Sequence, residues 1–269
     1  MLKAINETVS FIKEKTKFDP EVAIILGTGL GGVARDIDEE ISLHYSDIPN
    51  FPVSTAPGHT GKLIFGILGG KKVMAMQGRF HYYEGYTMDE IALPIRVMKY
   101  LGIKYLFISN ASGGLNPEFE IGDIMIQDDH INMMPNPLIG KHYDEFGDRF
   151  PDMSETYSKE LIAKAEKIAA NHNIKVQKGC YVGVTGPTLE TPKEYQFFRI
   201  IGGDAVGMST VPEVIVAHQM GIPCFALSII TDLGVPGKIV EVSVEDVQTA
   251  AAKTAPKMTF IMEKLIETL

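Results

Sequence analysis

The chain of 269 residues is 45% hydrophobic and 22% charged, ordinary values for a globular protein, and it is long enough for one large α/β domain or two small ones. Its formal net charge of −9 repels nucleic acid and anionic membranes, so any anion-binding site must be local. Residues 1–17 carry too much charge for a signal peptide, and no apolar run approaches the length of a membrane span. We therefore expect a cytoplasmic protein whose partners include neither nucleic acid nor a membrane.

Apolar periodicity and helix-start signals predict helices that alternate with strands. Short apolar runs predict strands at 22–26, 62–68, 71–76, 105–109, 123–127, 180–186, 204–208 and 224–230. Amphipathic spacing and N-terminal capping signals predict helices over 2–12, 87–101 and 154–170, and others that begin near 191, 210 and 243. Cys180 and Cys224 each lie in an apolar run, so we expect buried thiols rather than a disulfide.

The order of these elements indicates the fold class. A hairpin at Gly69-Gly70 combined with strand–helix alternation predicts one α/β domain over 1–269, with a central mixed β-sheet flanked by helices. No internal repeat or linker separates a second domain. Residues 128–153 form a predicted loop that is long for a compact domain, so we expect it to be functional or to lie at an interface.

The segment GTGLGG, residues 27–32, follows the first predicted strand and fits more than one kind of site. With Asp47 about twenty residues further on, it matches a dinucleotide-binding loop and would indicate an oxidoreductase. The segment that follows, VARDIDEE, is a poor helix, which weakens that interpretation, and a plain tight turn would also need glycines. We prefer a nest of backbone amides completed by the Thr28 hydroxyl, which would bind a small anion.

Polar residues follow several of the other predicted strands. Residues 109–115 (SNASGGL) supply backbone amides, and Ser209 and Thr210 lie at a helix start, where free N–H groups favour an anion. Glu190 and Asp232 each supply a carboxylate after a strand. Taken singly, each of these residues is explained equally well as a helix cap or a turn. Together they are typical of the ligand sites that open α/β sheets build at the C-terminal ends of their strands.

The stretch MQGRFHYYEGY, residues 76–86, places a guanidinium and an imidazole directly after a buried strand. If the chain stays extended there, Arg79 and His81 point to the same side, because side chains alternate along a strand. A histidine alone in this position is more often structural than catalytic. An arginine beside it offers a planar fork that matches phosphate oxygens.

Seven segments together resemble the trimeric type of purine nucleoside phosphorylase, a family shared with methylthioadenosine phosphorylases. In chain order they are ILGTGLGG, APGHTGKLIFG, MQGRFHYYEGY, NASGGLNP, GDIMIQDDHIN, FGDRFPDMS and DAVGMSTVPEVIVA. The match runs from about Val22 to the end of the chain and implies a nucleoside phosphorylase-like fold. It also reassigns the segment GTGLGG from a dinucleotide to a phosphate.

The resemblance implies a site for inorganic phosphate, which is a co-substrate, and no cofactor or metal ion. Its expected ligands are Thr28, His59, Arg79, His81, Ala111 through its backbone amide, and Ser209. Glu84 resembles a carboxylate that orients His81 and favours its charged form. We expect Arg79, at the end of a strand, to carry little core packing.

The resemblance also implies a nucleoside site next to the phosphate. Its expected residues are Tyr83, Ala111, Phe150, Leu189, Glu190, Val206, Met208, Asp232 and Val244. Of the whole set, His81, Glu190 and Asp232 are the expected catalytic residues. Phe150 resembles an aromatic residue that covers the sugar in the neighbouring subunit's site, which implies a homotrimer. A competing interpretation makes Phe150 part of a satellite core of its own chain.

The implied reaction is reversible phosphorolysis of purine (2′-deoxy)ribonucleosides to the free base and (deoxy)ribose 1-phosphate. Such a reaction passes through an oxocarbenium-like transition state, and hydrogen-bond donors to the departing purine lower its barrier. The alternatives are a nucleoside hydrolase, an NAD-dependent dehydrogenase and a non-catalytic nucleoside-binding protein. The dense phosphate set argues against the hydrolase, and a binding protein need not keep Arg79, His81 and Ser209 together.

The purine preference depends on two conflicting signals. Enzymes of this family specific for 6-oxopurines usually carry asparagine at the position of Asp232 and histidine at that of Val244, whereas methylthioadenosine phosphorylases resemble this chain at both. Glu190 is instead of the oxopurine type, and adenine would leave it unpaired at a cost of about 1–3 kcal/mol. A protonated Asp232 could donate to N7 or O6. We therefore expect a preference for inosine and guanosine; the alternative is a 5′-methylthioadenosine phosphorylase.

Overall fold

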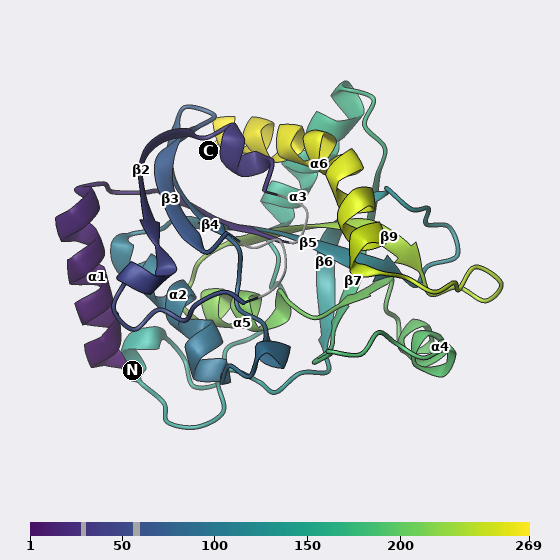
Figure 1. The fold of residues 1–269 in the computed structure, drawn as a ribbon, viewed down its shortest axis with the longest axis horizontal. Coiled ribbons are helices and arrows are strands. Elements are labelled where there is room, and N and C mark those ends of the chain that lie inside the picture. Colours follow the sequence, from purple (N-terminus) through teal and green to yellow (C-terminus); the bar gives the residue numbers. More distant parts are fainter. Residues whose placement is uncertain (28–30, 56–59) are drawn as a thin grey trace.

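A mixed β-sheet organises the computed structural model, which describes residues 1–27, 31–55 and 60–269 (Figure 1). Its strands are β1 (Val22–Leu26), β2 (Asp38–His44), β3 (Lys62–Leu68), β4 (Lys71–Gln77), β5 (Tyr105–Gly114), β6 (Ile124–Asn132), β7 (Val176–Gly183), β8 (Ala205–Gly207) and β9 (Cys224–Leu233). The α-helices are α1 (Leu2–Thr16), α2 (Met88–Leu101), α3 (Lys159–Asn171), α4 (Pro192–Ile200), α5 (Val211–Gln219) and α6 (Val244–Glu267). The predicted α/β fold with a mixed sheet flanked by helices is confirmed.

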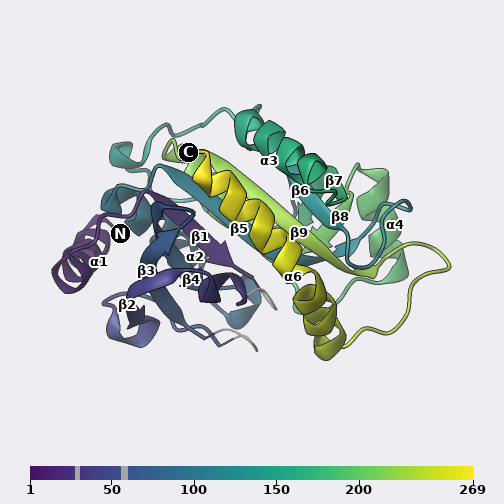
Figure 2. The ribbon, with the colours of Figure 1, turned by 90° about the horizontal axis from the view of Figure 1, so that it is seen from above.

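The sheet runs in the order β2-β3-β4-β1-β5-β8-β7-β6-β9, and β5 pairs with β9 as well. Because of this extra pairing, β5, β9, β6, β7 and β8 close into a ring. The parallel pairs β1–β4, β1–β5 and β5–β9 form the middle of the sheet, and every residue of β1 is buried there. Figure 1 shows α3 and α6 above these central strands and α2 and α5 below them, and Figure 2 shows α6 lying along β9.

Most helix starts follow the capping chemistry of the sequence. Thr87 and Glu90 form a reciprocal capping box at α2, and so do Thr191 and Glu194 at α4. The helix predicted over 154–170 begins later, because Ser158 is the residue that caps α3. The preceding residue forms an isolated bridge to Cys224, which holds it extended beside β9. Both cysteines are free, as expected; Cys224 is buried and Cys180 only half-buried.

The strands next to the site extend further than the sequence predicts. β5 continues through Asn110, Ala111 and Ser112, and β9 continues through Asp232, so these residues belong to strands and not to loops that follow them. The pairing of β5 with β9 shifts register there, and β9 gains one residue, Thr231. Such a bulge re-aims side chains. It allows Thr231 and Asp232, which are neighbours in one strand, to line the same cavity.

The chain after β1 excludes a dinucleotide-binding fold. Residues 33–35 form a single 3₁₀ turn, and residues 38–44 form the edge strand β2, so no long helix follows the glycine segment to receive a pyrophosphate. The glycine at position 27 is explained by packing and not by dinucleotide binding. A Cβ atom at this position would lie 2.7 Å from the carbonyl oxygen of Ser109, so only glycine lets the end of β1 approach β5 this closely.

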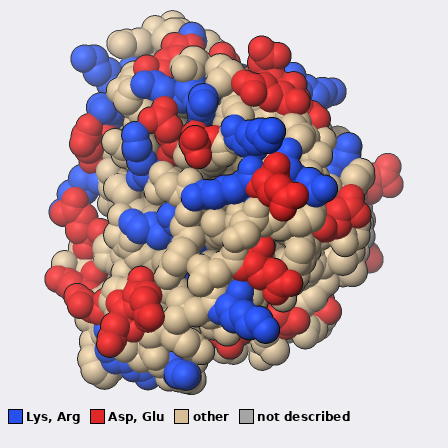
Figure 3. All heavy atoms as spheres, turned by 90° about the vertical axis from the view of Figure 1, so that its left-hand side faces the viewer, with Lys and Arg blue, Asp and Glu red and all other residues tan. Residues whose placement is uncertain are grey.

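Two observations concern the helices and the charges on one face of the molecule. Across the described ranges, none of the helices is both long and apolar enough to cross a bilayer. Figure 3 views the molecule from the side on which α1 lies, and acidic and basic side chains are interspersed over this face. This mixed pattern agrees with the expectation that an anion is bound locally, inside a cavity.

Candidate active site

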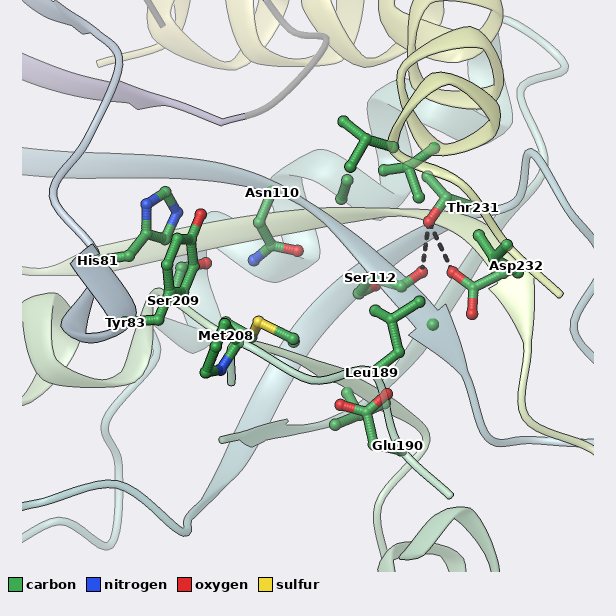
Figure 4. Close-up of a pocket in the computed structure, with 18 of the residues that line it drawn as sticks. His81, Tyr83, Asn110, Ser112, Leu189, Glu190, Met208, Ser209, Thr231 and Asp232 are labelled. Atoms are coloured by element: carbon green, nitrogen blue, oxygen red, sulfur yellow. Dashed lines mark hydrogen bonds between the residues drawn. The ribbon is translucent and has the colours of Figure 1, made fainter. Parts of the chain in front are cut away.

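A cavity of about 360 Å³ lies where β5, β8 and β9 meet the starts of α5 and α6. It brings together predicted residues from distant parts of the sequence: Arg79, His81, Tyr83, Ala111, Leu189, Glu190, Val206, Met208, Ser209, Asp232 and Val244. Figure 4 shows that these residues are sorted by chemistry. His81, Tyr83 and Ser209 lie at one end, Glu190 and Asp232 lie at the other, and Met208 lies between them.

Arg79 is the most deeply buried charged residue at the first end of the cavity, with 1% of its surface exposed. Its Nη1 donates to the Ser209 hydroxyl at 2.8 Å, and its Nε lies 3.3 Å from Oε1 of Glu213. The expectation that Arg79 carries little core packing is therefore wrong. The strand ends two residues earlier, and the chain then turns inward, where Tyr45 donates to the carbonyl of Gly78 at 2.8 Å.

His81 is held by a carboxylate three residues further along the chain. Oε1 of Glu84 is 2.9 Å from Nδ1 of His81 and accepts from the His81 backbone N–H at 2.8 Å. Its other oxygen accepts from the backbone N–H and the hydroxyl of Thr55. Burial alone would raise the pKa of Glu84, but these hydrogen bonds outweigh it and lower the pKa to about 2. Glu84 therefore stays ionised and fixes the imidazole from behind.

The start of α5 is strained in a way that aims hydroxyl groups at Arg79. Thr210 has φ 70° and ψ −53°, and the N–H of Val211 donates to the carbonyl of Ser209 at 2.7 Å, which closes a γ-turn. A β-branched residue in this conformation costs about 1–3 kcal/mol. The Thr210 hydroxyl accepts from Asn110 at 2.8 Å and does not cap the helix. The interpretation of Thr210 as a simple side-chain cap is therefore wrong.

Glu190 and Asp232 form the acidic end of the cavity. Burial raises the pKa of Asp232, and a hydrogen bond from the Thr231 hydroxyl at 2.9 Å opposes this only in part. Burial is also the main cause of the raised pKa of Glu190, and the charge of Asp232 adds to it, while the Tyr195 hydroxyl opposes it. Burial of both carboxylates, with the charge of Asp232 further raising the pKa of Glu190, favours a bound proton, which makes a donor available at this end.

In the part of the chain that the structure describes, the middle of the cavity is lined by an aromatic ring and apolar side chains and not by charged groups. The ring of Tyr83 stacks on that of His81, with centroids 4.7 Å apart and planes inclined by 15°. Met208 and the buried Val206 come from β8 and the segment after it. The wall at the start of α6 is mostly apolar: Val242, Val244 and Val247 line it together with Ser243, whose hydroxyl donates to Asp246 at 2.6 Å. A flat or ring-shaped ligand would thus contact apolar surface between two polar ends.

Among the predicted site residues that the structure describes, Phe150 does not line this cavity. Phe150 is 88% exposed and lines a second, open cavity of about 560 Å³ with residues such as Ile139 and Met153. The interpretation of Phe150 as satellite core of its own chain is therefore wrong. Thr28 and His59 lie outside the described residues.

Comparison with known proteins assigns the chain to a family. Residues 21–267 match the phosphorylase superfamily. The chain is 53% identical over 233 residues to purine nucleoside phosphorylase 1 of Bacillus subtilis (strain 168), with 86% of each chain covered. It belongs to the purine nucleoside phosphorylase family. Two crystal structures of Schistosoma mansoni purine nucleoside phosphorylase are also similar. The complex with adenosine has a TM-score of 0.95 and 42% identity over 99% of this chain and 97% of that one. The isoform 2 complex with cytosine and ribose-1-phosphate has a TM-score of 0.95 and 41% identity, with 99% and 96% covered.

This phosphorylase has cavity residues that sequence reasoning did not single out. They are Asn110, Ser112, Gly113, Pro187, Gly207, Thr231, Val242, Ser243 and Val247. Asn110 and Ser112 lie within the segment already suspected, but their inward position depends on how far β5 extends. Glu213 was missed for another reason, since a glutamate in the first turn of a helix looks like part of a cap.

The raised pKa of Asp232 predicts the pH dependence of an Asp232→Asn variant of the phosphorylase. Asp232 ionises near pH 4 in the unfolded chain and at higher pH in the folded chain, so the wild type loses stability as pH rises through this window. Asparagine has no such loss. The melting temperature of the ligand-free variant minus that of the wild type should therefore grow between pH 4 and the folded pKa, then level off. Asp19→Asn, which changes an exposed carboxylate, is the control. A difference that is constant or shrinks with pH would contradict the assignment.

Proposed function

We propose that this chain catalyses the reversible phosphorolysis of purine nucleosides, in the cytoplasm and as a homotrimer. The observation that carries the proposal is the sorting of the cavity into a cationic end, an apolar middle and an acidic end. Inorganic phosphate would be bound by Arg79, His81 and Ser209, the sugar by Tyr83 and Met208, and the base by Glu190 and Asp232. Thr28, His59 and the backbone amide of Ala111 complete the proposed phosphate site.

The polarity of the cavity suits the charges that develop in this reaction. As the glycosidic bond breaks, positive charge builds on the sugar, and a phosphate held by Arg79 and His81 would face it as nucleophile and counter-charge. Negative charge builds on the departing purine at the opposite end. A proton held by Asp232 or Glu190 would be donated toward it by a hydrogen bond. Each of the two ends thus stabilises the charge that forms beside it.

Phosphate dependence is the first expected outcome. The wild type should release hypoxanthine from inosine only when phosphate is present. Because Arg79→Ala would leave Glu213 buried without its partner, Arg79→Lys is the sharper variant. It keeps the positive charge but loses the planar fork, so the KM for phosphate should rise about tenfold or more while the KM for inosine changes little. Equal base release in phosphate-free buffer would show a nucleoside hydrolase instead.

The base preference follows from the hydrogen bonds that the acidic end can make. Glu190 can accept from N1–H of a 6-oxopurine, whereas adenine offers an acceptor at N1. Ionised Asp232 would suit the 6-amino group of adenine, and protonated Asp232 could donate to N7 or O6. We therefore propose inosine and guanosine as preferred substrates, with adenosine accepted more readily than by relatives that carry asparagine here. The similar proteins named above are purine nucleoside phosphorylases, which favours this choice over a methylthioadenosine phosphorylase.

Substitution of Asp232 and the choice of sugar test this preference together. Asp232→Asn removes the carboxylate that suits a 6-amino group, so the ratio of kcat/KM for adenosine to that for inosine should fall several-fold, by about 1 kcal/mol of discrimination. The wall around Val244 is mostly apolar, and the Ser243 hydroxyl beside it is already hydrogen-bonded to Asp246, so 5′-deoxyinosine should be cleaved nearly as well as inosine. Cleavage of methylthioadenosine far more efficiently than inosine would refute the preference.

The homotrimer is proposed from the position of Phe150. Its ring is 88% exposed although its loop is firmly attached: Gln219 donates to the carbonyl of Asp148 at 3.0 Å, and Nε2 of His218 lies 2.7 Å from the carbonyl of Asp152. A rigidly held, exposed aromatic ring is suited to cover an apolar surface on a partner. The proposed partner is a second copy of this chain, whose sugar pocket the ring would close.

Light scattering should give three times the mass of one chain. Phe150→Ala should raise the KM for inosine several-fold, by about 1 kcal/mol or more, without a comparable rise in the KM for phosphate. Ile200→Ala, which truncates another exposed apolar side chain, is the matched control. Coexpression of Phe150→Ala with Arg79→Lys should restore activity, because intact phosphate sites then receive a ring from a neighbour. A fully active monomer would contradict the proposal.

A further inference from the structure

Helix α5 presents a buried carboxylate to the arginine of the cationic end. Glu213, in the first turn of α5, is 5% exposed, and its Oε1 lies 3.3 Å from Nε of Arg79. Its other oxygen, Oε2, is buried and has no hydrogen-bond partner among the residues that the structure describes. The side chain also takes no part in capping α5. Arg79 is therefore the contact that accounts for a carboxylate in this place.

Stability alone is a weak explanation for this ion pair. Removing two charges from water is costly, and apolar residues of similar volume often replace a buried ion pair without loss of stability. The pair does restrict the geometry of Arg79. One corner of the planar guanidinium, Nε, faces Glu213, and a second corner, Nη1, donates to Ser209 at 2.8 Å and lies 3.5 Å from the Thr210 hydroxyl. Three contacts to one short segment, 209–213, fix both the position and the plane of the group.

His81 shows the same arrangement on the other side of the cationic end. Its ring is fixed by Glu84, which lies 2.9 Å from Nδ1. Arg79 and His81 thus each have a buried or half-buried carboxylate behind them, contributed by a different element of the chain. Since a planar fork binds phosphate well only in the correct orientation, the carboxylates act on the anion through the side chains that they hold.

We propose that Glu213 is a positioning residue for phosphate: it holds the plane of the Arg79 guanidinium toward the cavity, as Glu84 holds the ring of His81. This inference rests on the proposed function, because it requires the cationic end to bind inorganic phosphate. It assigns Glu213 no contact with the substrates. Its removal should therefore affect phosphate and leave the nucleoside end unchanged.

Two variants test the proposal by steady-state kinetics in inorganic phosphate and inosine. Glu213→Leu keeps the volume but removes the charge and the acceptor, so the KM for phosphate should rise about tenfold or more. Glu213→Gln keeps the shape and one acceptor oxygen, so the KM should rise about threefold or more, which remains measurable if the leucine variant does not fold. The KM for inosine at saturating phosphate should stay within about twofold of the wild type. Glu166→Gln, which removes a surface ion pair of 3.2 Å with Lys178, is the control and should leave both constants unchanged.

The wild type is measured first, so that a lack of phosphate dependence, which would refute the proposed function, is distinct from failure of this inference. With phosphate dependence established, an unchanged KM for phosphate in Glu213→Gln would overturn the positioning role. A lower KM would also overturn it, because Glu213 would then weaken anion binding through its charge. Parallel rises in both KM values, together with a lower melting temperature, would show a purely structural role.

Discussion

The parallel pairing of β5 with β9 is the constraint on which the site depends. It places Ala111 of one strand and Asp232 of the other at the floor of a single cavity, although they are far apart in the sequence. The bulge at Thr231 matters as much as the pairing, because a regular strand would send Thr231 and Asp232 to opposite faces. Gly27 and Gly113 lie where neighbouring strands approach too closely for a side chain. A Cβ at Gly27 would collide with the backbone of Ser109, and one at Gly113 would lie 3.0 Å from Asp232.

An acidic chain can build an anion site only by local means, and this one does so with paired charges. Arg79 and His81 are each backed by a carboxylate, so the cationic end presents hydrogen-bond donors to the cavity without a large net charge. The local field is then directional: donors face the cavity and acceptors face the protein. At the opposite end the buried acidic groups lack such partners among the described residues. Burial of two carboxylates with little positive charge nearby favours a bound proton there.

The sequence predicted those parts of the fold that depend on local chemistry. The capping boxes at Thr87 and Thr191 and the hairpin at Gly69-Gly70 are set by neighbours within a few residues, and the structure contains all three. Strand ends were less predictable, because β5 and β9 continue only as far as they pair with each other. Periodicity in one segment carries no record of a partner more than a hundred residues away.

The site was predicted in the same uneven way. Residue type and motif identified Arg79, His81, Glu190, Ser209 and Asp232, and the structure brings all five to one cavity. The burial of Arg79 was not predictable, because a residue after a strand can turn toward solvent or toward the core. Glu213 was hidden by its position in a first helical turn, where the same residue type usually serves the backbone.

The γ-turn at Thr210 sets stability against activity at one residue. Glycine would relieve the backbone strain at φ 70°, since it has no Cβ, but it would also remove the hydroxyl that accepts from Asn110 and faces Arg79. Directed evolution for heat resistance would thus meet a substitution here that improves a melting curve while it loosens the start of α5. A library screened only for folding would enrich such variants, and one screened for turnover would discard them. Position 210 is therefore one to exclude from any thermostabilisation of this enzyme.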